Sequence, residues 1–183
     1  MKRWQRIGEP ELVYDGWRKI FKKTFRMSNG KEMVAEVDDR NGERAVAIIA
    51  LTRENQVVIA RQFRCGPEKI FDELPGGLVD EGEEPELAAV RELREETGYS
   101  VGRVESLGIA YKHPWLSMEW HYFIAYECEK VDTQHLEETE DIEIDEISIA
   151  ELFENARTAK MTDSEAVLLA YDVLAELQKE LRG

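Results

Sequence analysis

The chain has 183 residues, and 39 Asp and Glu against 24 Lys and Arg give it a formal net charge of −15. Its length suits one domain of ordinary size, and 43% hydrophobic with 34% charged residues is typical of a folded globular protein. The acidity argues against broad binding to nucleic acid or to an anionic membrane surface, because no run of Lys or Arg offsets it. A phosphate-bearing substrate would therefore need a cation between itself and this protein.

The two cysteines, Cys65 and Cys128, are far apart in sequence, and neither has a second Cys or His beside it at metal-site spacing. We expect reduced thiols rather than a disulfide framework or a zinc site. The N-terminus lacks the apolar region of a secretory signal, and the longest apolar run, residues 45–51, is far shorter than the ~20 residues of a membrane span. The sequence thus predicts a cytoplasmic protein with no membrane segment.

The first half of the chain is typical of consecutive strands. Residues 17–27 alternate imperfectly, and Asn29-Gly30 predicts a hairpin into a second strand over residues 31–37, which ends at an Asn41-Gly42 turn. The unbroken apolar run 45–51 indicates a strand buried on both faces. Two further strands are expected at residues 57–63 and 70–74.

The second half mixes helices with strands. We expect a helix over residues 85–97, because Pro85 suits its first turn and Gly98 its end. The remaining elements predicted are strands at 101–111, 121–128 and 142–147 and helices at 149–156 and 162–181. The last helix has an apolar stripe that includes Leu169 and Val173. This order predicts an α/β (α+β) sandwich in which helices cover a mixed sheet.

The helix over residues 85–97 carries the most informative pattern. At about 100° per residue, Glu92, Glu95 and Glu96 share one face. The side chains expected in the core lie opposite, namely Leu87, Val90, Leu93 and Thr97. Like charges on one face cost roughly 0.2–0.5 kcal/mol per pair, so a purely structural helix would usually intersperse lysines. The pattern indicates either a solvated acidic face or, because a Gly-Gly turn leads straight into the helix, a metal site.

An oxygen-only cluster suits the hard cations Mg²⁺ and Mn²⁺ better than zinc. Such ions bridge protein carboxylates to substrate phosphates and acidify a bound water. A metal at this helix would supply the cation that an acidic protein needs near a phosphate-bearing substrate.

The segment from Gly77 to Tyr99 reads GLVDEGEEPELAAVRELREETGY. It resembles the Nudix box: Gly, five residues, Glu, seven residues, then Arg-Glu-aliphatic-any-Glu-Glu-any-Gly-aliphatic. The chain matches with Gly77, Glu83 and residues 91–98, and departs only where Tyr99 replaces an aliphatic residue. The resemblance implies a Nudix α/β/α sandwich over residues 43–183, preceded by antiparallel strands over residues 1–42.

The resemblance also implies roles for the matching residues. Glu83 would tie the loop to the helix, and Arg91 would orient the carboxylates through ion pairs, an arrangement that keeps flexible ligands in geometry. The implied ligands of Mg²⁺, or of Mn²⁺, are Glu92, Glu95, Glu96 and the carbonyl of Gly76. The resemblance also implies that Glu95 and Arg91 take part in catalysis.

Three further features resemble the ADP-ribose pyrophosphatase and nucleoside diphosphate sugar hydrolase branch. They are the run from Glu73 to Gly77, the Arg61-Gln62-Phe63-Arg64 strand end, and Pro114 sixteen positions after Gly98. Residues 113–119 depart from the branch because they lack its usual Ser-Pro-Gly beginning. The implied substrate-binding residues are Arg64, Glu73, Trp17, Pro114 and Trp115; the alternative is that these charges and aromatics serve structure alone.

The acidic loop over residues 133–141 matches the mobile catalytic loop of this branch. It would swing Glu138 or Glu140 toward the attacking water, with Glu138 favoured as the base and Glu140 nearer the metal; the alternative is a solvated charge run. The N-terminal strands, which carry Trp4, Tyr14 and Trp17, are implied to be exchanged in a homodimer.

The resulting expectation is Mg²⁺-dependent hydrolysis of the pyrophosphate of a nucleoside diphosphate sugar, with ADP-ribose giving AMP and ribose 5-phosphate. GDP-mannose or another nucleotide sugar is an alternative substrate. A catalytically silent nucleotide-sensing scaffold is a second alternative, which the complete glutamate set argues against. An RNA-processing Nudix enzyme is a third, which the net charge of −15 disfavours.

Overall fold

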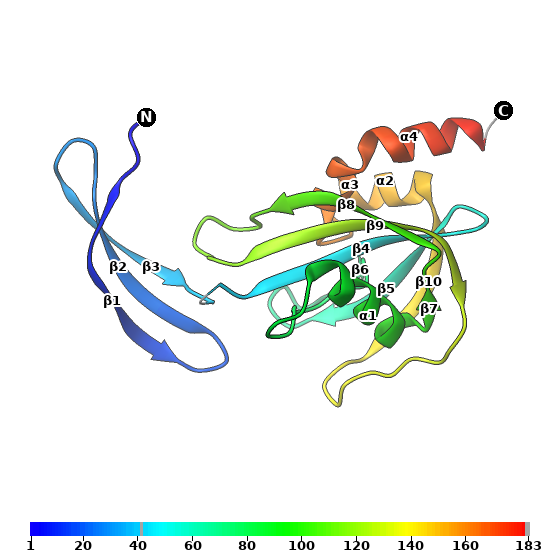
Figure 1. Cartoon of the computed structure of the whole chain (residues 1–183), viewed down its shortest axis with the longest axis horizontal. Coiled ribbons are helices and arrows are strands. Elements are labelled where there is room, and N and C mark those ends of the chain that lie inside the picture. The colour runs from blue at the N-terminus through cyan, green and yellow to red at the C-terminus, as the bar shows by residue number, and fades with distance from the viewer. Residues whose placement is uncertain (41, 182–183) are drawn as a thin grey trace. The chain divides into compact units, whose positions relative to one another are not determined.

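The computed structural model describes residues 1–40 and 42–181 (Figure 1). Two compact units make up the chain: unit 1 contains residues 1–43 and 111–119, and unit 2 contains the described residues of 44–110 and 120–183. The sequence predicts a domain boundary after residue 42, and it predicts that residues 111–119 belong to the second domain. In the structure, residues 111–119 belong to unit 1. Asn41, in the expected Asn41-Gly42 turn, lies outside the described residues, as do residues 182–183 of the expected Nudix domain.

Unit 1 contains an antiparallel sheet of three strands in the order β1-β2-β3. The strands are β1 (Gln5–Asp15), β2 (Lys19–Arg26) and β3 (Glu32–Asp38). The predicted hairpin joins β2 to β3, since Gly30 has a φ of 82° and the N–H of Met27 donates to the carbonyl of Lys31 across 2.8 Å. The prediction of N-terminal antiparallel strands is confirmed.

β1 is not predicted from the sequence pattern, since the strand expected over residues 17–27 is β2. Its pairing with β2 is interrupted between Ile7 and Glu11, and Gly8 there has a φ of 68°. Pro10 lies in the same interruption and has no N–H to donate, which an edge strand tolerates. Because the alternation of apolar and polar residues is broken here, the sequence pattern does not indicate this strand.

Residues 111–119 extend the end of β3 in unit 1. The N–H of Asp38 donates to the carbonyl of Trp115 across 2.8 Å, and the N–H of Ser117 donates to the carbonyl of Asp38 across 3.0 Å. Residues 38 and 116 form a parallel bridge. The loop that carries Pro114 and Trp115 is thus held by backbone pairing.

Unit 2 is built on a seven-stranded sheet in the order β10-β5-β4-β9-β7, with β6 beside β5 and β8 beside β9. Its strands are β4 (Arg44–Thr52), β5 (Gln56–Arg64), β6 (Lys69–Glu73), β7 (Tyr99–Ser100), β8 (Arg103–Ala110), β9 (Glu119–Lys130) and β10 (Ile142–Ser148). All but β7, the pair of residues after the first helix, correspond to strands predicted from the sequence.

Helices cover both faces of this sheet, as Figure 1 shows. On one face Val46, Ile48 and Ala50 of β4 pack against α1 (Pro85–Thr97). On the other face, the alternate residues of β4 pack in a core with α2 (Ile149–Arg157), α3 (Ser164–Leu169) and α4 (Tyr171–Glu180). The predicted α/β/α sandwich and the burial of β4 on both faces are confirmed.

The bounds of α1 agree with the sequence, but its core face is partly wrong. Pro85 begins the helix, and Gly98, with a φ of 76°, ends it by donating its N–H to the carbonyl of Arg94. Leu87, expected in the core, is 62% exposed, whereas Ala88 and Ala89 are buried. These small side chains allow α1 to approach β4 closely, and Glu96 on the same helix is only 3% exposed.

The predicted helix over residues 162–181 is interrupted. Ala170, with φ −90° and ψ 3°, separates α3 from α4, and it is fully buried. Leu169 and Val173, on either side of this break, are exposed rather than part of the buried stripe. Across the described residues, no helix is both long enough and apolar enough to cross a membrane.

Candidate active site

The loop between β6 and α1 runs along the edge of β4. The N–H of Ile48 donates to the carbonyl of Pro75 across 3.0 Å, and the N–H of Val46 donates to the carbonyl of Gly77 across 2.9 Å. An antiparallel bridge follows between Ala45 and Leu78. This pairing fixes the loop immediately before the helix that carries the glutamates.

The N–H of Gly76, in the same loop, points away from β4 toward α1. This N–H donates to Oε2 of Glu96 across 2.9 Å. The N–H and C=O of one extended residue point to the same edge, so the carbonyl of Gly76 is directed to the side of Glu96. A side chain at Gly76 is excluded, because a Cβ would lie 2.1 Å from the carbonyl oxygen of Val46.

Gly77 leaves room for the carboxylate of Glu92. A Cβ built on Gly77 would lie 2.5 Å from Oε1 of Glu92. A side chain is therefore excluded at the two positions for different steric reasons. Gly76 lies against the backbone of β4, and Gly77 lies against a glutamate of α1.

Arg91 is the centre of the ion pairs on α1. Its Nε and Nη2 donate to the two carboxylate oxygens of Glu83 across 3.1 and 3.0 Å, and its Nη1 donates to Glu92 and Glu95 across 2.8 and 3.0 Å. Nη2 also donates to the carbonyl of Leu78 across 3.1 Å. These bonds raise the pKa of Arg91, and the bond to Arg91 lowers the pKa of Glu83. In this geometry Glu83 links the loop to α1 through Arg91, and Arg91 orients the carboxylates of Glu92 and Glu95.

Burial makes the glutamate cluster electrostatically unusual. Glu96 is only 3% exposed, and burial, reinforced by the charges of Glu92 and Glu140, raises its pKa to about 8. Burial also raises the pKa of Glu92, with a further contribution from Glu140. Carboxylates that disfavour one another's ionisation in this way are strongly stabilised by a cation.

The late loop is anchored to the C-terminal end of α1. Nε2 of Gln134 donates to the carbonyls of Glu96 and Ile142 across 2.8 and 3.0 Å, and the N–H of His135 donates to the carbonyl of Glu95 across 2.8 Å. Sequence reasoning did not identify these two anchors, because their contacts use backbone carbonyls that no motif marks.

Glu138 and Glu140 lie in one tight turn of the late loop. The N–H of Glu140 donates to the carbonyl of Glu137 across 3.1 Å, and Oε2 of Glu140 accepts from the N–H of Glu137 across 2.9 Å, so residues 137–140 form a turn. The charge of Glu140 acts on Glu92 and Glu96. Glu138 lies at the exposed tip of the turn.

Arg64 and Glu73 bind each other. Nε of Arg64 lies 3.0 Å from both carboxylate oxygens of Glu73, and its Nη2 lies 2.5 Å from Oε2. Glu73 is 3% exposed, whereas the side chain of Arg64 is 48% exposed. The bond to Glu73 raises the pKa of Arg64, and the charges of Asp163 and Glu96 act in the same direction.

The other predicted substrate contacts, Trp17, Pro114 and Trp115, belong to unit 1. Trp17 is 78% exposed, and the guanidinium groups of Arg18 and Arg40 lie 5.3 and 4.7 Å from its ring centroid. Their roles toward substrate stay predictions.

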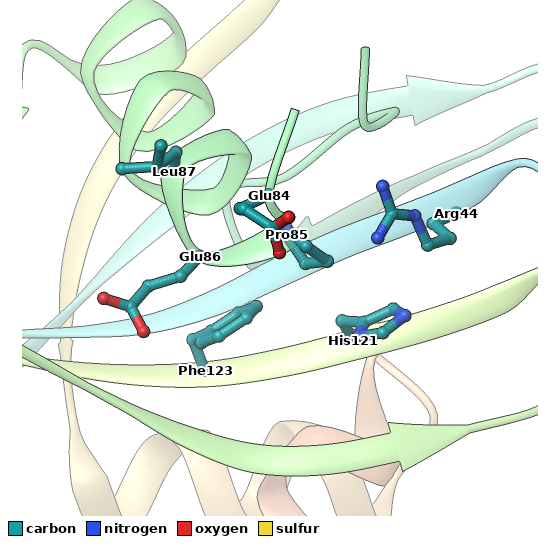
Figure 2. A pocket seen from close by; sticks show the side chains of 7 residues that line it. All are labelled: Arg44, Glu84, Pro85, Glu86, Leu87, His121 and Phe123. Atoms are coloured by element: carbon teal, nitrogen blue, oxygen red, sulfur yellow. The ribbon is translucent and has the colours of Figure 1, made fainter. Parts of the chain in front are cut away.

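A hollow of about 560 Å³ lies near the N-terminal end of α1 (Figure 2). Its lining residues are Arg44, Glu84, Pro85, Glu86, Leu87, His121 and Phe123. None of the predicted catalytic, metal or substrate residues is among them. The hollow is therefore separate from the predicted reacting centre.

The donor set on α1 fits a hard divalent cation. Its side-chain donors are carboxylate oxygens, and Gly77 leaves space beside Glu92. Among residues 1–40 and 42–181, no three His, Cys, Asp or Glu side chains are already gathered closely enough to hold a metal ion. Since Arg91 binds Glu92 and Glu95, a cation would compete with Arg91 for these two carboxylates.

The family model of the NUDIX domain matches residues 42–170. This chain belongs to the Nudix family. It is 31% identical over 147 residues to an ADP-ribose pyrophosphatase of Bacillus subtilis (strain 168), covering 79% of this chain and 78% of that protein. It is 37% identical over 146 residues to a GDP-mannose pyrophosphatase of Escherichia coli (strain K12), covering 73% and 74%. A solved ADP compounds hydrolase matches its fold with a TM-score of 0.81, covering 97% of each chain at 21% identity.

The chain is therefore a Nudix hydrolase, and such enzymes generally use divalent metal ions. Tyr99, the departure from the Nudix pattern, does more than pack. It is 5% exposed, and its hydroxyl donates to Oε1 of Glu146 across 2.5 Å. The side chain of Tyr99 thus joins β7 to β10.

Proposed function

We propose that this Nudix hydrolase cleaves the pyrophosphate bond of a nucleoside diphosphate sugar, with ADP-ribose giving AMP and ribose 5-phosphate. One observation carries the proposal: Glu96 is buried at the loop of Gly76, and the charges of Glu92 and Glu140 help to raise its pKa to about 8. Such a cluster favours a divalent cation, and the cation would neutralise a diphosphate.

Mg²⁺, with Mn²⁺ as a substitute, is the cofactor that we propose; when bound, it would polarise the pyrophosphate and acidify a water. The groups that would hold it are the carboxylates of Glu92, Glu95 and Glu96 and the carbonyl of Gly76. Arg91 would orient Glu92 and Glu95, with which it already pairs.

The late loop would supply the base. A water oxygen attacks one phosphorus, the bond from that phosphorus to the bridging oxygen breaks, and a carboxylate of the loop accepts the water proton. We favour Glu138 for this role, because Glu140 is held in the turn and acts on the metal-binding glutamates. The turn would move as a unit about its anchor at Gln134.

Arg64 and Glu73 are the substrate contacts that we propose in unit 2. The bonds from Arg64 to Glu73 use Nε and Nη2, so Nη1 is available to a phosphate oxygen, and Glu73 would accept from a sugar hydroxyl. In unit 1, we propose that Trp17 stacks on the base and that Pro114 and Trp115 line the pocket of the terminal sugar. The acidic surface again disfavours nucleic acid as a substrate.

GDP-mannose is the second candidate substrate. The relative from Escherichia coli and the departure of residues 113–119 from the ADP-ribose pattern both support it. Steady-state hydrolysis of ADP-ribose, GDP-mannose and ADP-glucose, with products separated by chromatography, distinguishes the two. A higher kcat/KM for ADP-ribose, with AMP released, supports the first proposal; a higher value for GDP-mannose overturns it in favour of the second.

We also propose a homodimer through the strands of unit 1. Leu12, Val13, Tyr14, Trp17 and Val34 are 40–78% exposed there. A three-stranded sheet needs a covered apolar face for stability, and a second copy of the chain would provide it. We expect the protein in the cytoplasm, where Cys65 and Cys128, both free, would stay reduced.

A further inference from the structure

The side chain of Asp163, in the connection between α2 and α3, does not point toward the helix that it precedes. Asp163 is at the N-cap position of α3, yet its side chain accepts no capping hydrogen bond. Asp is among the residues that cap helices best, so a carboxylate at this position would be expected to accept a backbone N–H of the first turn of α3. Asp163 is also only 3% exposed, and a buried carboxylate needs partners.

The carboxylate of Asp163 instead faces the loop of the candidate active site. Its Oδ2 accepts from the N–H of Leu74 across 3.3 Å, within the buried interior. Leu74 lies between Glu73, which binds Arg64, and Gly76, which binds Glu96. Asp163 therefore contacts the segment that joins the proposed substrate and metal contacts.

A second tether from the same connection holds the end of β6. The N–H of Asp72 donates to the carbonyl of Lys160 across 3.1 Å, and Nζ of Lys160 lies 3.1 Å from Oδ2 of Asp72. Asn155 of α2 donates to the same carboxylate oxygen across 3.1 Å. Since β5 pairs with β6 on one edge, and residues 160–163 meet residues 72 and 74, the strand end is held from both sides.

We infer that Asp163 is a positioning residue: by accepting the N–H of Leu74, it sets where the carbonyl of Gly76 and the carboxylate of Glu73 lie. This inference rests on the proposed function for its metal ligand at Gly76. It deepens that function by assigning control of the site to the C-terminal helical layer, which contains no proposed metal or substrate contact.

The test is Mn²⁺ binding, followed by the EPR signal of the free ion, in protein stripped with EDTA. Loss of a residue that orients a metal ligand typically costs about 10–100-fold in metal affinity. For Asp163→Ala we expect about a tenfold weaker Mn²⁺ affinity and a similar rise in the Mg²⁺ concentration for half-maximal hydrolysis. Asp163→Asn keeps an oxygen acceptor for the N–H of Leu74, so it should restore most of both.

Glu165→Ala is the matched control. Glu165 lies in the first turn of α3, and in the described part of the chain no hydrogen bond or ion pair joins it to residues 72–74. We expect wild-type affinity for Mn²⁺. Equal losses in Glu165→Ala and Asp163→Ala would mean a general loosening of α3 and would overturn the inference.

Two further results would also overturn it: wild-type Mn²⁺ affinity in folded Asp163→Ala, or no rescue by folded Asp163→Asn. Should Asp163→Ala fail to fold, Lys160→Met removes the side-chain contact of the second tether with Asp72, and we expect about a tenfold loss of Mn²⁺ affinity there too; unchanged affinity would then count against the inference. Absence of Mn²⁺ binding by the wild type would instead refute the proposed function.

Discussion

The N–H of Gly76 binds the carboxylate of Glu96 across 2.9 Å, which joins the loop on the edge of β4 to the C-terminal half of α1. Because the same loop pairs with Val46 and Ile48, the glutamates of α1 are held at a fixed distance from the central strand. The site is thus anchored to β4, a strand inside the seven-stranded sheet, rather than to a separate loop.

Glu96→Gln should remove activity while leaving the fold intact. An amide oxygen can still accept from Gly76, but a neutral group should weaken the binding of Mg²⁺. Since burial raises the pKa of Glu96 to about 8, this carboxyl must take up a proton when the stripped protein folds at pH 7, and glutamine avoids that cost; the variant should therefore be more stable than the wild type, by about 1 kcal/mol or about 2–4 °C in Tm. Melting curves in EDTA and turnover against Mg²⁺ check both; wild-type turnover at limiting Mg²⁺ would contradict the metal assignment.

Glu138→Gln should lower kcat and kcat/KM together by about 10²–10⁴, with KM nearly unchanged, as expected of a general base. Glu140→Gln should instead shift the Mg²⁺ requirement, because the charge of Glu140 acts on Glu92 and Glu96. Rates are measured for both variants across a Mg²⁺ titration. The assignment fails if Glu138→Gln keeps a near-normal kcat while Glu140→Gln takes the full loss at saturating Mg²⁺.

The wild type should sediment as a dimer at micromolar concentration, whereas the double variant Leu12→Asp, Tyr14→Asp should shift toward monomer. Both side chains are exposed on β1, at 45% and 58%, and charges there would oppose burial against a second copy. Leu168→Asp, at a position of α3 that is 76% exposed, is the control and should stay dimeric. A fully active wild-type monomer would rule out the proposed role of the N-terminal strands.

Asp72→Asn should destabilise the protein near the lower end of the ~3–5 kcal/mol expected for breaking a buried ion pair. Asp72 is 2% exposed, and its carboxylate oxygens lie 2.6 Å from Nε of Arg61 and 3.1 Å from Nζ of Lys160. Asp145→Asn removes a more exposed partner of the same arginine and should cost at most about 1 kcal/mol. Urea unfolding of both variants at pH 7 checks the order, which equal costs would contradict.

The same residue predicts the direction of a pH dependence. The ion pairs lower the pKa of Asp72 below its usual value of 3.8. Its stabilisation is therefore fully present above about pH 4 and is lost as the pH falls through the folded-state pKa. The stability difference between wild type and Asp72→Asn should shrink below pH 4; a difference that grows there would contradict the assignment.

Local chemistry made much of unit 2 predictable. Pro85 and Gly98 mark both ends of α1, and the spacing of Glu92, Glu95 and Glu96 places them on one helix. The burial of Glu96 was not predictable from periodicity alone, because it depends on how closely Ala88 and Ala89 let the helix approach β4. The break at Ala170 has no Gly or Pro to mark it, and only the tertiary packing of α3 and α4 requires it.

The central claim is that the glutamates of α1 bind a divalent cation that the protein needs to split the pyrophosphate of a nucleoside diphosphate sugar. Its most direct measurement is the hydrolysis of ADP-ribose and GDP-mannose by protein stripped with EDTA, before and after Mg²⁺ is added, with all products identified. We predict no turnover without Mg²⁺, and release of AMP with ribose 5-phosphate, or of GMP with mannose 1-phosphate, once it is added. Equal turnover with and without Mg²⁺, or no turnover of either substrate when Mg²⁺ is present, would contradict the account.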